Sequence, residues 1–263
     1  MPTASALPGR ANGCRVGNPA CVVVLGASGG IGRAVCDGLA ARGRRFVAAG
    51  RDAERLTPIT AGRDARAMTL DALDAAALEV VLRQVAEFGG GELAGIAHCI
   101  GSVVLKPAHA TGEAEWREVM ATNLDSAFLV VRAAARVMKA GGSVVLCSST
   151  AARVGLANHE AIAAAKAGVE GLVRAAAATY AGRNLRFNAV APGLVRTPQT
   201  ARITDNPATL EQSMQMHPLG RIGDPQHVAA AILWLLDPAN DWITGEVIGV
   251  DGGMARVRRV ARS

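Results

Sequence analysis

The stretch that decides the fold is Cys21-Val22-Val23-Val24-Leu25-Gly26-Ala27-Ser28-Gly29-Gly30-Ile31-Gly32. Its first five residues form an unbroken apolar run, which is typical of a parallel strand buried on both faces. The glycine-rich segment that follows leads directly into residues 33–41, which have the composition of a helix. A strand, a glycine turn and a helix in this order predict the first unit of a doubly wound α/β sheet.

Further short apolar runs alternate with segments of helical periodicity along the chain. Together with the first run they predict strands at residues 21–25, 46–49, 67–70, 95–99, 143–147, 185–190 and 247–250. Strands separated by helices favour a Rossmann-like, doubly wound parallel sheet of about seven strands. Residues 198–223 lack a firm pattern and form either a substrate lid or an ordinary surface loop.

The same patterns divide the chain into one domain and two tails. We expect a disordered N-terminal tail at residues 1–19, a domain at residues 20–254 and a basic C-terminal tail at residues 255–263. The basic tail carries Arg256, Arg258, Arg259 and Arg262 within a net charge of +6. It could contact nucleic acid or anionic lipid, but we prefer a solvated chain end, with no nucleic-acid or membrane partner.

Composition narrows the range of functions. Half of the 263 residues are apolar, which supplies a large core, and only 3% are aromatic, too few for a surface that stacks on bases. The five cysteines form no CxxC pair and no metal-ligand spacing with histidine, so we expect reduced thiols and no metal. No stretch resembles a secretory signal or a membrane span, which predicts a cytoplasmic protein.

The glycine turn predicts a phosphate-binding site. Gly26, Gly30 and Gly32 lack side chains that would block a pyrophosphate, and Ser28 and Ile31 lie between them. The helix that starts here presents free N–H groups and the positive end of its dipole. We expect a dinucleotide pyrophosphate at this turn, although a tight strand-to-helix turn alone would also select glycine. The spacing GxxxGxG resembles that of the short-chain dehydrogenase/reductase family.

Motifs at several separated places resemble the same family, from Cys21 to Gly253. They are Asp71, His98-Cys99-Ile100-Gly101, Thr122-Asn123-Leu124, residues 142–149 with Ser149, residues 163–168 with Lys166, Pro192-Gly193-Leu194-Val195-Arg196-Thr197, and residues 243–253. The resemblance implies that Asp71 holds the adenine ring and that Gly101, Pro192, Gly193, Val195 and Thr197 border the cofactor. It also implies catalytic roles for Ser149, Lys166 and Asn123, with Lys166 on the nicotinamide ribose, and a homo-oligomer, a dimer or tetramer.

The end of the second predicted strand bears on the choice of cofactor. NAD-binding proteins place an acidic residue there on the ribose 2′-hydroxyl. Gly50 stands where NAD-dependent relatives carry this aspartate, and Arg51 follows. A guanidinium can bind a 2′-phosphate through two hydrogen bonds, which favours NADP(H) over NAD(H). Asp52, and the interpretation of Arg51 as an ordinary surface residue, keep NAD(H) open.

The resemblance breaks at the proton donor. The family has a tyrosine four residues before the lysine, where this chain has Ile162. Tyr180 is the single tyrosine, and 18 residues along a continuous helix place it about 27 Å away. His159 lies seven residues before Lys166, a spacing that resembles the tyrosine of the enoyl thioester reductase branch. His159 is therefore a candidate proton donor, or, with Asn158, part of a helix-capping turn.

These observations favour an NADP(H)-dependent oxidoreductase. Its substrate would be the ketone, alcohol or enone of a small molecule or acyl thioester, with the oxygen oriented by Ser149. A plain strand-end turn would also explain the hydroxyls of residues 148–150. The alternative function is a catalytically silent dinucleotide-binding subunit or sensor, which Ile162 and the altered segment at residues 98–101 favour.

Overall fold

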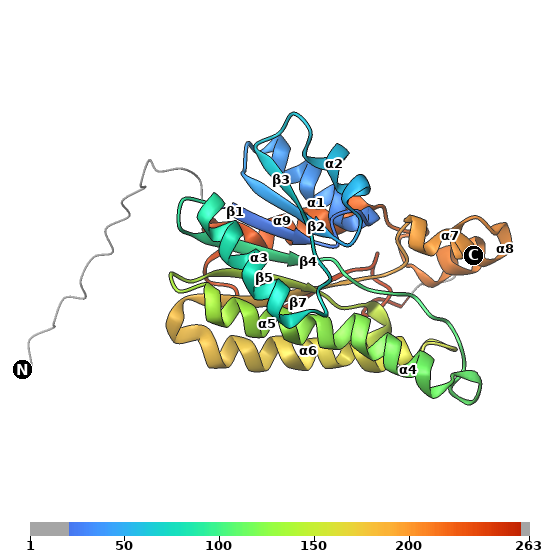
Figure 1. Cartoon of the computed structure of the whole chain (residues 1–263). Helices are drawn as coiled ribbons and strands as arrows, with labels where there is room; N and C mark the ends of the chain where they lie inside the picture. Colours follow the sequence, from blue (N-terminus) through green and yellow to red (C-terminus); the bar gives the residue numbers. More distant parts are fainter. Residues whose placement is uncertain (1–20, 259–263) are drawn as a thin grey trace, which may run out of the picture.

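Seven parallel strands form the central sheet in the computed structural model, which describes residues 21–258 (Figure 1). The strands are β1 (Cys21–Leu25), β2 (Phe46–Gly50), β3 (Ala65–Thr69), β4 (Leu93–His98), β5 (Gly142–Cys147), β6 (Leu185–Pro192) and β7 (Val247–Val250). Their order is β3-β2-β1-β4-β5-β6-β7. Strands β2 and β3 therefore lie on one side of β1, and β4 to β7 lie on the other. Open α/β sheets bind ligands at the carboxyl ends beside such a switch point.

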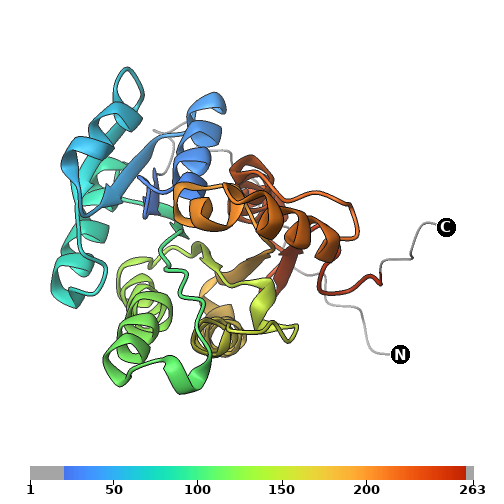
Figure 2. The same cartoon turned by 90° about the vertical axis from the view of Figure 1, so that its right-hand side faces the viewer.

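Helices cover both faces of the sheet (Figure 2). One face packs on α1 (Gly30–Ala41), α2 (Ala53–Thr60) and α9 (Pro225–Leu236), and the other on α3 (Ala75–Phe88), α5 (Ser126–Val137) and α6 (Glu160–Tyr180). Helix α4 (Glu113–Met120) enters α5 through a π-helical turn, η2 (Ala121–Asp125). After β6 come η5 (Pro198–Thr200), α7 (Ala201–Thr204) and α8 (Pro207–Met216). The predicted fold class is confirmed.

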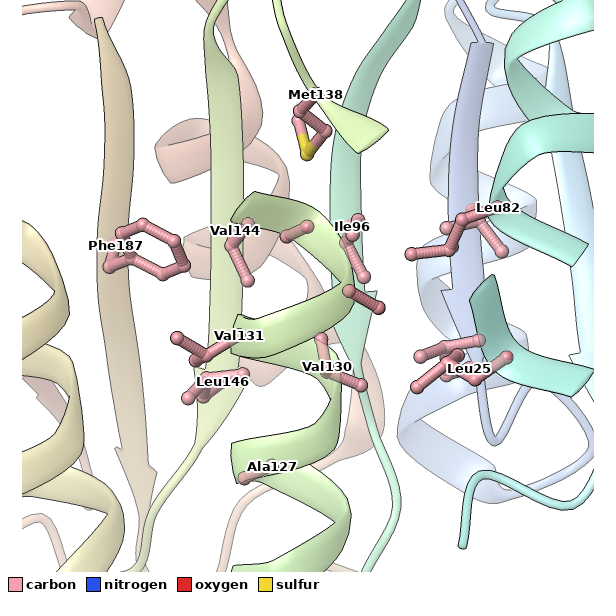
Figure 3. Packing of buried hydrophobic residues seen from close by; sticks show 14 of the residues in the cluster. Leu25, Leu82, Ile96, Ala127, Val130, Val131, Met138, Val144, Leu146 and Phe187 are labelled. Atoms are coloured by element: carbon pink, nitrogen blue, oxygen red, sulfur yellow. The ribbon is translucent and has the colours of Figure 1, made fainter. Parts of the chain in front are cut away.

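Apolar side chains fill the space between the sheet and α5 (Figure 3). Leu25, Ile96, Val144 and Phe187 are buried on the strands, and Val130 on the helix belongs to the same cluster. Full burial of a side chain of this size contributes about 1.5–3 kcal/mol. This packing holds the carboxyl ends of β1, β4, β5 and β6 in fixed positions, and these ends carry the candidate site.

The structure differs from the sequence-based expectation at residues 198–223. This segment contains the helices α7 and α8, although its apolar periodicity is weak. The Asn206 side chain accepts the backbone N–H groups of Ala208 and Thr209 at 3.0 and 3.2 Å, and Pro207 occupies the first turn of α8. Capping by asparagine and proline thus starts a helix where hydrophobic periodicity gives no signal.

The strand ends shift slightly from the predicted ones, and Cys99 lies just beyond β4 instead of within it. The predicted N-terminal tail at residues 1–19 lies outside the described residues, as do residues 259–263 of the predicted basic tail. Across residues 21–258, no helix is both long enough and apolar enough to cross a membrane. The same residues contain no cluster of three or more His, Cys, Asp or Glu side chains suited to a metal ion.

Candidate active site

The N-terminus of α1 lies at the glycine turn and has no side-chain cap among the described residues. Gly29 occupies the N-cap position, and the first turn contains no acidic residue. Helices α2, α3 and α8, by contrast, have N-cap residues whose side chains accept backbone N–H groups. These are Asp52, Asp74 and Asn206. The positive end of the α1 dipole is therefore free to bind an anion such as a pyrophosphate.

Two glycines of this turn are required by the packing of the protein itself. Gly26 has a φ of +77°, and a Cβ atom there would lie 2.9 Å from the carbonyl oxygen of Cys99. A Cβ atom on Gly32 would overlap the carbonyl oxygen of Gly26. Gly30 faces the loop after β6, because a Cβ atom there would lie 2.8 Å from Cγ2 of Thr197. The turn thus brings the ends of β1, β4 and β6 together.

The end of β2 forms a basic corner beside the glycine turn. A Cβ atom on Gly50 would lie 3.8 Å from Oγ of Ser28, so a side chain at position 50 would approach the turn. Arg51 is exposed. Asp52 accepts the backbone N–H groups of residues 54 and 55 at 3.1 and 3.2 Å, so its carboxylate is used to cap α2. Arg55 donates from Nη2 to the carbonyl oxygen of Ser28 at 3.1 Å.

The sequence-based reasoning missed Arg55. No local pattern indicated it, because Arg51 precedes the Asp52 N-cap of α2 and the contact of Arg55 with Ser28 depends on tertiary packing. Asp71, predicted for the adenine ring, follows β3 and is exposed. Its Oδ1 accepts the backbone N–H of Leu73 at 3.0 Å, which fixes the orientation of the carboxylate.

Lys166 is buried at the carboxyl ends of β4 and β5. Its Nζ donates to the carbonyl oxygen of Cys147 at 2.8 Å. A Cβ atom on Gly101 would lie 3.4 Å from this Nζ and 3.0 Å from Oδ1 of Asn123, so both side chains lie against Gly101. Burial lowers the pKa of Lys166 to about 8. An ammonium group therefore stands in this site at neutral pH.

Asn123 lies in the π-helical turn, a feature that is frequent at functional sites. Its Oδ1 accepts the backbone N–H of Ser102 at 3.0 Å. Its Nδ2 donates to Oγ of Ser102 at 2.8 Å and to the carbonyl oxygen of Val119 at 2.9 Å. The amide therefore holds the loop after β4 against the helices.

Ser149 follows β5 and caps the short helix η3 (Thr150–Ala152). Its Oγ accepts the backbone N–H of Ala151 at 3.2 Å. Because a hydroxyl also donates, its hydrogen remains available for a substrate oxygen. Of the hydroxyls at residues 148–150, Ser148 and Thr150 are turned inward and bond Glu170 and Asp251. Ser149 is the least buried of the three.

The loop after β6 is the remaining predicted border of the site. Val195 is buried, and Thr197 forms a capping box with Thr200 at the start of η5. His217, which sequence reasoning did not single out, packs against Gly193 and accepts the backbone N–H of Leu194 at 3.2 Å through Nε2. Pro192, predicted on the same border, ends β6 directly before this loop.

Comparisons with known proteins identify the family of the chain. A family model described as enoyl-(acyl carrier protein) reductase matches residues 26–255. A solved structure of a short-chain type dehydrogenase/reductase from Mycobacterium ulcerans superimposes with a TM-score of 0.85 at 30% identity, covering 90% of each chain. The chain belongs to the short-chain dehydrogenase/reductase family.

Two curated relatives of this short-chain dehydrogenase/reductase are named as oxidoreductases. Galactitol 2-dehydrogenase (L-tagatose-forming) of Cereibacter sphaeroides is 38% identical over 89% of this chain and 94% of its own length. A 3-oxoacyl-acyl-carrier-protein reductase of Vibrio cholerae is 34% identical over 88% of this chain and 96% of its own length. The resemblance inferred from the motifs is confirmed at the level of the family.

This family member differs from the motif pattern at residue 162. Ile162 lies on α6 one turn before Lys166 and is only 5% exposed. Tyr180 lies at the far end of α6, where its ring packs 5.7 Å from that of Phe187. A phenol therefore cannot reach the site from α6, as the helix length predicts.

His159 lies at the N-cap of α6, and the helix begins only at Glu160. The positive φ of 63° at Asn158 turns the chain just before it, and the His159 side chain makes no capping hydrogen bond to the helix. The His159 Nδ1 lies 2.7 Å from the carbonyl oxygen of Ala157, which can only accept. Nδ1 therefore carries the hydrogen, and Nε2 is the acceptor of the ring.

His98, the first residue of the segment at residues 98–101, has a structural role. It is 1% exposed, and burial together with the Lys166 charge lowers its pKa to about 3. Its Nε2 lies 3.0 Å from Oγ of Ser126, whose own hydrogen goes to the carbonyl oxygen of Thr122 at 2.7 Å. Nε2 is therefore the donor, while Nδ1 has no partner within residues 21–258. A neutral imidazole ties β4 to α5.

Proposed function

We propose that this protein transfers hydride between NADP(H) and the ketone, alcohol or enone of a small molecule or acyl thioester. The observation that carries the proposal is that three features lie at the carboxyl ends of the neighbouring strands β1, β4 and β5. These are the Lys166 ammonium, the available hydroxyl of Ser149 and the uncapped start of α1. The names of the relatives, which concern a polyol and an acyl thioester, support both substrate types.

Each group has a distinct task in this proposal. The nicotinamide supplies or accepts the hydride when it is bound. Ser149 donates a hydrogen bond to the substrate oxygen and thereby polarises the carbonyl. Lys166 bonds the nicotinamide ribose and adds a positive charge that stabilises a developing oxyanion. Asn123 keeps the loop after β4 in place through Ser102.

The possible reactions differ in the proton transfer that they need. Reduction of a conjugated C=C bond needs no acid on the protein, because water can protonate the enolate that hydride addition leaves. Oxidation of an alcohol needs a base, and the Nε2 atom of His159 is the acceptor in the ring. In the reverse reaction, the reduction of a ketone, the same atom would return the proton to the substrate oxygen.

The choice of NADP(H) rests on Arg51 and Arg55 and can be tested by binding. A charge-assisted hydrogen bond contributes about 1.5–3 kcal/mol, so Arg51→Ala or Arg55→Ala should weaken NADPH binding about 10- to 100-fold. NADH binding should stay nearly unchanged, because NADH has no 2′-phosphate. Fluorescence titration with both nucleotides measures the effect.

A matched control for this test is Arg42→Ala. Arg42 lies just after the far end of α1, where its guanidinium bonds the carbonyl oxygen of Gly38. This variant should leave both affinities unchanged. Equal losses of NADPH and NADH in Arg51→Ala and Arg55→Ala would contradict the NADP(H) assignment.

A silent dinucleotide-binding subunit is the second candidate function. The buried Ile162 favours it, because the position of the family's acid holds an alkyl side chain that cannot exchange a proton. Such a protein would bind NADPH at the same site and oxidise none.

We also propose that the protein forms a homo-oligomer. Trp116 on α4 and Phe128 on α5 leave 41% and 50% of their surface exposed, and a second copy of the chain could cover these aromatic side chains.

A further inference from the structure

Two cysteines meet at the ends of adjacent strands beside Lys166. Cys147 is the last residue of β5, and Cys99 directly follows the last residue of β4. The parallel register pairs His98 with Leu146, so the next position on each strand is a cysteine. Both belong to the apolar cluster on the α1 side of the sheet, so their side chains point to the same face.

The spacing of these two positions suits a disulfide. Neighbouring strands lie about 4.7–4.9 Å apart, within the Cα separation of about 4.4–6.8 Å that a disulfide requires. Cys147 is 8% exposed, and Cys99 is partly exposed. The site thus has a path for a small reagent, in contrast to the fully buried thiols of Cys21 and Cys36.

The chemistry of the pair differs from that of the other buried thiols. The neighbouring Cys99 thiol and the Lys166 ammonium lower the pKa of Cys147. The contact with Cys147 and burial raise the pKa of Cys99. Burial raises the pKa of both Cys21 and Cys36 to about 12. Because the thiolate is the reactive form, Cys147 is the nucleophile of the pair and Cys99 is its partner.

We propose that Cys99 and Cys147 form an oxidisable dithiol that a peroxide converts into a disulfide. The Cys147 thiolate attacks one peroxide oxygen, and the O–O bond breaks to leave a sulfenic acid and an alkoxide or hydroxide. The latter takes up the proton that Cys147 released. The Cys99 thiol then attacks the Cys147 sulfur, forms the S–S bond and releases water. The two thiols lose two electrons and two protons, which reduce the peroxide to an alcohol or water and a second water.

Oxidation of this cysteine pair should weaken binding of the cofactor, a consequence that rests on the proposed function. The carbonyl oxygen of Cys147 holds Lys166, and that of Cys99 lies against Gly26. A disulfide draws the two Cβ atoms to about 3.8 Å, closer than the strand spacing, so its formation strains the two strand ends that carry these carbonyl groups. We expect NADPH binding to weaken about tenfold, the equivalent of one charge-assisted hydrogen bond from Lys166.

The test uses the full chain, fully reduced and then treated with hydrogen peroxide. Free thiols are alkylated, and the digest is analysed by mass spectrometry without reduction. The expected result is a peptide pair joined through Cys99 and Cys147, which dithiothreitol reverses and Cys147→Ser abolishes. The matched controls Cys21→Ser and Cys36→Ser should still form it. Oxidation of Cys147 to a sulfinic acid without this bond, a disulfide to Cys36 instead, or intact thiols would each overturn the proposal.

NADPH titration of the reduced and oxidised protein separates this inference from the proposed function. The expected result is a reversible loss of affinity of about tenfold. Formation of the disulfide without a change in NADPH affinity would overturn the proposed link between oxidation and cofactor binding. A reduced protein that binds no NADPH would contradict the proposed function. The mass of the linked peptides would still show whether Cys99 and Cys147 form a disulfide.

Discussion

Lys166 controls the proposed chemistry through its charge. Its Nζ is held by the carbonyl oxygen of Cys147, and burial lowers its pKa to about 8. Below this pH the side chain is an ammonium that can bond the ribose, and above it the side chain is a neutral amine. We therefore predict that NADPH affinity of the free protein is highest below pH 8 and falls as the pH rises through about 8. Fluorescence titration between about pH 6 and pH 10 measures this.

The matched variant for this prediction is Lys166→Arg, which keeps its charge over the whole range. Its affinity for NADPH, even if lower throughout, should not fall near pH 8. A wild-type profile that stays flat up to about pH 10 would show that the charge on residue 166 does not contribute to binding.

At the same scale, motif spacing led to candidate residues at the strand ends but not to their hydrogen bonds. Lys166 and Ser149 follow from motif spacing, and both lie at the carboxyl ends of the strands. The role of Asp52 as a helix cap and the contact of Arg55 with Ser28 could not be foreseen. Both depend on where α2 begins relative to the glycine turn, which is a property of tertiary packing.

The hydrogen bond that connects β4 to α5 depends on the neutral imidazole of His98. Its folded pKa of about 3 lies below the ordinary value near 6.5, so the folded protein binds fewer protons between these values. Stability is therefore full above about pH 6.5 and is lost as the pH falls toward 3. We predict that, from pH 7 to pH 5, the free energy of unfolding falls by about 2 kcal/mol less in His98→Asn than in the wild type. Urea unfolding at both pH values measures the difference.

The control for this prediction is His109→Asn, because His109 lies exposed in the short helix η1 (Ala108–Ala110). This variant should lose as much stability as the wild type between the two pH values. If His98→Asn also loses as much stability as the wild type, protonation of His98 is not what destabilises the protein in acid.

Elements with strong apolar runs were predictable, and elements defined by polar contacts were not. Strands such as β1 and β5 carry continuous apolar residues because both of their faces are buried. Helix α8 depends on the Asn206 cap. The π-helical turn around Asn123 depends on bonds to Ser102, 21 residues away in sequence, which no local pattern reveals.

In the whole molecule, loops from distant parts of the chain converge where the strand order switches at β1. Gln199, in η5 after β6, donates from Nε2 to the carbonyl oxygen of Gly101 after β4 at 2.7 Å. Thr197 lies against Gly30 of the first turn. The doubly wound fold made this convergence predictable, because parallel strands end on one side. The individual contacts across the crevice depend on loop conformations that the sequence pattern does not specify.

The central claim is that this site transfers hydride although residue 162 is not a tyrosine. The most direct measurement is the loss of NADPH absorbance with the purified protein and a panel of enones, ketones and quinones, beside the variants Ile162→Tyr, His159→Ala and Lys166→Met. We predict turnover of at least one enone by the wild type, little affected by His159→Ala and reduced by about 100-fold or more in Lys166→Met. Tight NADPH binding without any turnover, with activity appearing only in Ile162→Tyr, would contradict the claim and identify a silent dinucleotide-binding protein.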